Sequence, residues 1–126
     1  MREDSENFLC EEEFFFKDEE SLVEYLDKEG FSAREIVRTL SHENAHIHKA
    51  REFGYHFSSY KVRKSREEIR IIPIFDLSYY LNSNQSERRE IALAPEDPSE
   101  NDFRVAEREK FILNSAEFKE DKNILI

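Results

Sequence analysis

The stretch SAREIVRTLSHENAHIHKAREFG, residues 32–54, predicts the longest helix of the chain, and the other elements are arranged around it. Ser32 and Glu35 have the spacing of a capping box, in which each side chain accepts a hydrogen bond from the other residue's backbone N–H. Gly54 stands where a glycine commonly ends a helix. The apolar residues that fall on one arc at 100° per residue are Ala33, Ile36, Val37, Leu40 and Ile47. We therefore predict a helix over residues 33–53 with this arc toward the core.

Inside this helix, His42-Glu43-Asn44-Ala45-His46 forms an H-E-x-x-H pattern. Residues four apart lie on the same helix face, one turn above the other, so both imidazoles can bind one Zn²⁺. Glu43 then lies beside the metal, where it can take a proton from a bound water whose pKa zinc lowers to about 7. We predict His42 and His46 as metal ligands and Glu43 as the catalytic base. The alternative is two surface or capped histidines beside an incidental glutamate.

A third protein ligand is expected, because catalytic zinc usually has three and leaves the fourth position to water. Asp102, in the first turn of a predicted last helix, is the first candidate. It also fits a purely local role, as the partner of Ser99 in a capping box. Glu107, on a different face of that helix, and His56, just past the long helix, are the other candidates. His48 points away from the histidine pair and is predicted to be a surface residue.

Shorter elements lie on both sides of the long helix. Before it we predict a strand at 13–17 and a helix of about 19–29. After it, residues 55–62 and 69–77 are rich in aromatic and β-branched residues, and a charged connection between them predicts a β-hairpin. Pro73 has no N–H to donate to a ladder, which places the second strand at an edge or at a bulge.

The remaining segments predict one small α+β domain with a C-terminal helix. A short helix is expected near 87–93, and a last helix over about 100–118. Residues 1–12 are an acidic, aperiodic tail of the kind in which disorder concentrates, and residues 13–126 form a single domain. The residues expected to be partly buried in the last helix are Phe103, Ala106, Phe111 and Leu113.

The composition excludes several classes of function. The chain has 126 residues, with 29 Asp and Glu against 19 Lys and Arg and a formal net charge of −10. Such an acidic surface disfavours nucleic acid and anionic membranes as partners. No apolar run approaches the about 20 residues of a membrane-spanning helix, and no signal-peptide pattern follows the acidic start. The single cysteine, Cys10, cannot form an internal disulfide, which favours a cytoplasmic location.

Three motifs together resemble the peptidase domain of the FtsH-type ATP-dependent zinc metalloproteases. They are the H-E-x-x-H pattern at 42–46, the Ile-Ile-Pro strand at 71–73 and Asn101-Asp102-x-x-x-Ala106. In that family a HEAGHA helix is followed by a β-hairpin with an I-I-P-like strand and by an N-D-x-x-x-A helix that supplies an aspartate ligand. The family's L-G-G-R-x-A-E-E helix has only a shortened counterpart at 88–94.

The resemblance implies a zincin-like fold in which His42, His46 and Asp102 hold zinc and Glu43 is the catalytic base. Ala45 stands in place of the family's glycine before the second histidine, so the local packing must differ. A chain of 126 residues has no room for the family's ATPase, and no membrane segment is seen. We therefore expect a stand-alone peptidase-like domain.

The predicted function is hydrolysis of peptide bonds by a zinc-activated water. The substrate is expected to be a peptide or protein that pairs as an added strand with residues 55–62. Three tyrosines are candidate donors to the oxyanion that forms during hydrolysis: Tyr60, Tyr79 and Tyr80. The alternative is a peptidase-like binding or regulatory module that catalyses nothing.

Overall fold

The computed structural model describes residues 12–109, which form an α+β arrangement of five helices and one three-stranded antiparallel sheet. The strands are β1 (Glu12–Phe16), β2 (Phe57–Lys64) and β3 (Ile69–Phe75), in the order β1-β2-β3. The predicted hairpin is confirmed, because β2 and β3 pair in an antiparallel register. Pro73 lies in β3, an edge strand of the sheet, as its missing N–H predicted.

The position of β2 corrects one prediction. Residues 55–62 were expected to offer a free edge to a substrate, but β2 is the central strand and pairs with β1 and β3. The backbone groups on both its sides are therefore used within the sheet. Among the described strands, β1 and β3 are the two edges of the sheet.

The two helices before β2 form as their capping residues predict. Helix α2 (Glu19–Lys28) begins after Asp18, whose carboxylate accepts a 2.7 Å hydrogen bond from the Ser21 N–H. Helix α3 (Ala33–Glu52) begins with the predicted capping box between Ser32 and Glu35. Gly54 follows it with a φ of 91°, a left-handed conformation that glycine adopts without strain.

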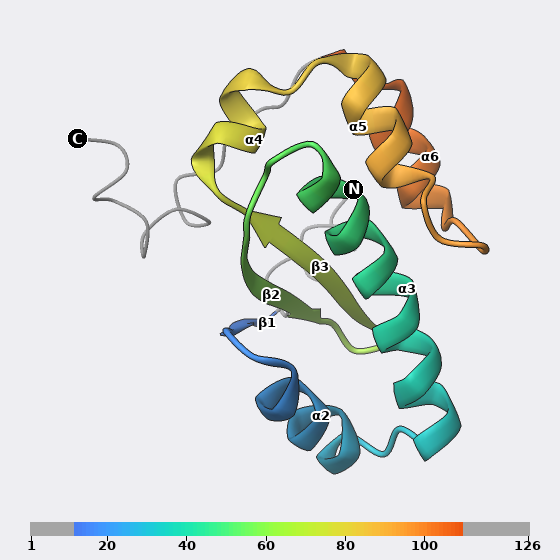
Figure 1. Ribbon diagram of the computed structural model, residues 1–126. Coiled ribbons are helices and arrows are strands. Elements are labelled where there is room, and N and C mark those ends of the chain that lie inside the picture. The colour runs from blue at the N-terminus through green and yellow to red at the C-terminus, as the bar shows by residue number, and fades with distance from the viewer. Residues whose placement is uncertain (1–11, 110–126) are drawn as a thin grey trace, which may run out of the picture.

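The core lies between the sheet and these two helices (Figure 1). Leu22 and Leu26 of α2 are fully buried there, and Ile36 and Ile47 of α3 pack into the same cluster. The predicted apolar arc of α3 is only partly buried, because Val37 and Ala33 are exposed. The remaining buried members come mostly from the strands and from later helices: Ala50, Tyr55, Tyr60, Val62, Phe75, Tyr79 and Ile91.

Three short helices follow the sheet. Helix α4 (Leu77–Asn82) was not predicted, since its apolar residues continue the strand-like run of β3, and its signal is the N-cap Asp76. Helix α5 (Gln85–Ala92) begins two residues earlier than expected. Helix α6 (Glu100–Glu107) begins with a Ser99–Asp102 capping box. Helix α5 packs against α3 and α6 packs against α5, which brings α6 beside the long helix (Figure 1).

Helix α6 is much shorter than predicted. It ends at Glu107, and Arg108 has an extended backbone. Ala106 is buried as expected, whereas Phe103 is exposed. The predicted burial of Phe111 and Leu113 concerns residues outside the described range. Within residues 12–109, no helix is both long and apolar enough to cross a bilayer.

Candidate metal centre

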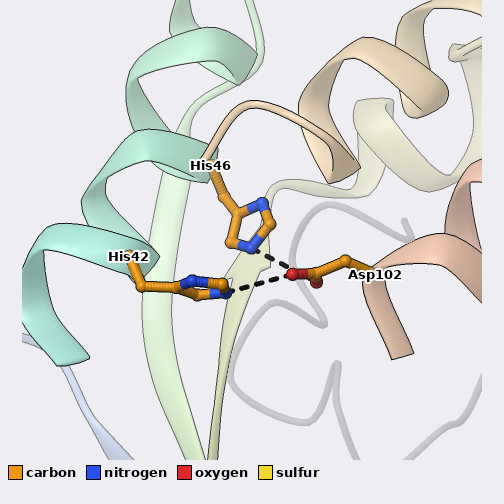
Figure 2. Close-up of side chains that lie close together, drawn as sticks. All are labelled: His42, His46 and Asp102. Atoms are coloured by element: carbon orange, nitrogen blue, oxygen red, sulfur yellow. Dashed lines mark hydrogen bonds and ion pairs between the residues drawn. The ribbon is translucent and has the colours of Figure 1, made fainter. Parts of the chain in front are cut away.

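Three predicted site residues meet at one point between α3 and α6. His42 Nε2 lies 3.0 Å from Asp102 Oδ2, and His46 Nε2 lies 3.3 Å from Asp102 Oδ1. One ligand atom from each residue lies within 4.8 Å of the other two. Figure 2 shows both imidazoles pointing from α3 toward the carboxylate of α6. The structure thus brings together His42, His46 and Asp102.

Local helix geometry explains where these side chains point. His42 and His46 are four residues apart on α3, so their rings lie on one face, with centroids 5.0 Å apart and nearly perpendicular planes. Asp102 is held at the start of α6, where Asp102 Oδ2 accepts a 2.9 Å hydrogen bond from the Ser99 N–H. The cap and the histidine contact are therefore not alternatives, because one carboxylate makes both.

The three residues could hold a metal ion. Ligand atoms 2.0–2.1 Å from a tetrahedral zinc lie about 3.3 Å from one another, which matches the 3.0 and 3.3 Å contacts between the imidazoles and Asp102. Two imidazoles and one carboxylate are also a common ligand set of catalytic zinc, which keeps a fourth position open. All three ligand atoms lie within 4.8 Å of one another, so the side chains would have to close around a bound metal.

Both histidines are oriented by hydrogen bonds on their other ring nitrogen. His46 Nδ1 donates to the Ile91 carbonyl at 2.8 Å, and His42 Nδ1 lies 3.1 Å from Asp97 Oδ1. Such partners hold the ring so that Nε2 is available to a metal. The contact with His42 lowers the pKa of Asp97, so this carboxylate stays ionised. Neither partner was predicted from the sequence: residues 95–98 carried only a helix-ending signal, and Ile91 contributes only its backbone carbonyl.

The charges in the cluster stabilise one another. Burial alone would raise the pKa of Asp102, but hydrogen bonds from His46 and Ser99 outweigh it, and the pKa is lowered. Burial would likewise lower the pKa of His46, but its bonds to Asp102 and Ile91 raise it. In the metal-free protein the cluster therefore favours an imidazolium beside a carboxylate, and metal binding must displace that proton.

Glu43 is buried beside this cluster without a hydrogen-bonding partner. It is 8% exposed, and no residue in 12–109 forms a hydrogen bond with its carboxylate. Burial raises its pKa to about 8, against the opposing effect of His46 and with a smaller contribution from the charge of Asp102. Buried acids are normally paired because an unpaired one costs free energy. An acid retained in this position is typical of a functional site.

The cluster and Glu43 line a cleft of about 400 Å³. One wall is β3, at Ile71, Ile72 and Pro73, and the other is the start of α6. The edge of the sheet thus runs past the two histidines. An extended chain lying in this cleft would meet the Nε2 side of the histidine pair.

Metal-free protein is expected to lose stability as pH rises from about 5 to 8. The pKa of Glu43 is about 8 in the folded state against an ordinary value of 4.5, so stability is full below pH 4.5 and is lost toward pH 8. The glutamine of Glu43→Gln does not titrate. The free energy of unfolding of this variant at pH 8 should therefore exceed that of wild type by on the order of 2–4 kcal/mol. Urea unfolding with a chelator at pH 4.5 and 8 measures this. The same change of unfolding free energy with pH in both proteins would contradict this prediction.

The other candidate ligands lie elsewhere. Glu107 is exposed at the end of α6, where its Oε2 lies 2.7 Å from Arg89 Nη1. His56 is exposed and precedes β2. His48 is exposed on α3, 3.4 Å from Glu52, as predicted for a surface residue. Of the three candidates for the third ligand, Asp102 alone joins the histidine pair.

The three tyrosines differ in position. The Tyr60 hydroxyl donates to Asn44 Oδ1 at 3.0 Å, so its proton is already used. Tyr79 and Tyr80 line a recess of about 260 Å³ that His46 and Asp102 also line. Their role as donors to an oxyanion stays a prediction.

Comparison with protein-family models, with curated proteins and with solved structures finds no match to this chain. The resemblance to FtsH-type peptidases therefore rests on the three motifs alone.

Proposed function

We propose that this chain is a zincin-like metallopeptidase domain that hydrolyses peptide bonds, with zinc held by His42, His46 and Asp102. The observation that carries the proposal is the buried Glu43, whose carboxylate forms no hydrogen bond with any residue of 12–109 and which lines the same cleft as the three ligands. A structural zinc site has four protein ligands and no use for a neighbouring base. A site with three ligands and a free carboxylate is suited to activating water.

The residues divide the chemistry between them. Zinc bound at this site would lower the pKa of a water and polarise the carbonyl of the scissile peptide bond. Glu43 would accept a proton from the attacking water and would deliver it to the leaving amine nitrogen when the C–N bond breaks. With a cation nearby, Glu43 ionises at a lower pH than in the metal-free protein, because an opposite charge favours the charged form.

The substrate is proposed to be an extended peptide paired with the free side of β3. This replaces the pairing expected with residues 55–62, which both neighbouring strands already use. Ile71 and Ile72 of β3 line the cleft beside His42, Glu43 and His46. Backbone pairing binds any sequence, and side-chain pockets then select among peptides. Pro73 lacks an N–H, so peptide pairing is weakest there.

The proposal predicts about one zinc per chain and cleavage of peptides that depends on it. Full-length protein purified with zinc is incubated with a broad peptide library, and new termini are identified by mass spectrometry. Activity should disappear with a chelator and return with zinc. Protein that binds no zinc would contradict the whole proposal. Zinc-loaded protein that cleaves nothing would support the non-catalytic binding module instead.

A further inference from the structure

The sheet has two faces, and α2 and α3 cover one of them. Side chains alternate between faces along a strand. Tyr60 and Val62 of β2 belong to the core cluster on the inner face, so Lys61 between them lies on the outer face. Its partner in the ladder is Ile72, and Ser59 pairs with Ile74. These four residues define the outer face of the sheet.

The outer face is buried although the core cluster does not include it. Lys61 and Ile74 are each 2% exposed and Ser59 is 4% exposed. Neither Ile72 nor Ile74 belongs to the cluster formed with α2 and α3. On a bare sheet a lysine extends its ammonium group into water. Such low exposure indicates that a further layer covers this face.

The chain leaves the described range beside this face. Helix α6 ends at Glu107, and the guanidinium of Arg88 donates to the carbonyls of Arg108 and Glu109, which holds the exit in place. Arg108 lines the same 260 Å³ recess as Lys61, Ile72 and Ile74. From this point 17 residues, 110–126, follow.

The length and composition of residues 110–126 suit the outer face. At about 3.3 Å per residue they reach about 55 Å when extended, whereas three strands are only about 10 Å wide. The segment opens with apolar Phe111, Ile112 and Leu113 and continues with acidic residues at 117, 120 and 121. The outer face offers Ile72 and Ile74 for the first group, and Lys61 on the same face lies 3.6 Å from Glu13.

We propose that residues 110–126 pack across the outer face of the sheet, with residues 111–113 on Ile72 and Ile74. Salt bridges alone would contribute little here, so the apolar contact supplies most of the binding free energy. This inference does not depend on the proposed peptidase activity.

Reaction of lysines with an amine-acylating reagent tests the proposal in the full chain. Mass spectrometry should find Lys61 protected relative to exposed Lys28. The double variant Phe111→Ser, Leu113→Ser should raise Lys61 reactivity several-fold. Phe103→Ser, an exposed phenylalanine on α6, is the matched control and should leave it unchanged. A Lys61 that reacts like Lys28 in wild type, or stays protected in the double variant, would overturn the proposal.

A second measurement keeps the test decisive if the double variant unfolds. A nitroxide is attached at Ser115→Cys in a Cys10→Ser background. The NMR methyl signals of Ile72 and Ile74 should then broaden. Those of Ile36, which packs in the core cluster under α3, should broaden less. Equal broadening of all three, or none, would refute packing on the outer face. Broadening or Lys61 protection that weakens on dilution would instead assign the cover to a second copy of the chain.

Discussion

Glu43→Gln is expected to keep zinc and to lose peptide hydrolysis by about 10²–10⁴-fold, the usual contribution of a general acid–base group. Glutamine is nearly isosteric with glutamate and cannot accept the proton of the attacking water. Glu43 is not one of the three clustered ligand residues, so the metal content should stay near one ion per chain. Paired measurements of zinc by elemental analysis and of cleavage by mass spectrometry separate the two effects.

Glu52→Gln is the matched control for this substitution. Glu52 lies at the end of the same helix, exposed and 3.0 Å from Lys49, and should behave as wild type in both assays. If Glu43→Gln cleaved peptides as fast as wild type, the catalytic role of Glu43 would be wrong. If it lost zinc as well, Glu43 would have to be reassigned as a ligand.

His46→Ala is expected to abolish stable zinc binding and, with it, all hydrolysis. His46 is buried and its Nε2 faces Asp102, so its loss leaves only two protein ligands of the three that catalytic zinc usually has. The variant also removes the donor to the Ile91 carbonyl, and an unsatisfied buried acceptor costs about 1–3 kcal/mol. Zinc content after dialysis is therefore compared at a temperature where circular dichroism shows the variant to be folded.

His48→Ala serves as the control, because His48 is exposed on the same helix two residues away. It should retain one zinc and full activity. Folded His46→Ala that still carried one zinc per chain would show that the metal lies elsewhere. Asp102→Asn compared with Glu107→Gln extends the test to α6, where only the change at Asp102 should weaken binding.

Local features of the fold were predictable from the sequence because their causes are local. The capping residues Asp18, Ser32 and Ser99 place the starts of three helices within a residue, since each satisfies N–H groups of its own first turn. Helix α4 escaped prediction for the same reason: Leu77 and its aromatic neighbours fit a strand as well as a helix. Over such a short run, periodicity does not decide between the two.

The site divides in the same way between sequence and tertiary structure. The sequence alone determines that His42 and His46 share one face of a helix with Glu43 beside them, because the 3.6-residue period requires it. It left the third ligand open among Asp102, Glu107 and His56. That choice depends on the packing of α5 on α3 and α6 on α5, contacts between residues about 60 positions apart.

Tertiary structure also decided which strand borders the site and how the histidines are held. In the described sheet β2 is central and β3 is the edge strand that borders the cleft, a result of strand order that no local pattern encodes. The Ile91 carbonyl and Asp97 reach the histidines only because α5 and the chain after it lie against α3. The helical period thus determined the histidine pair, and long-range packing determined everything that completes the site around it.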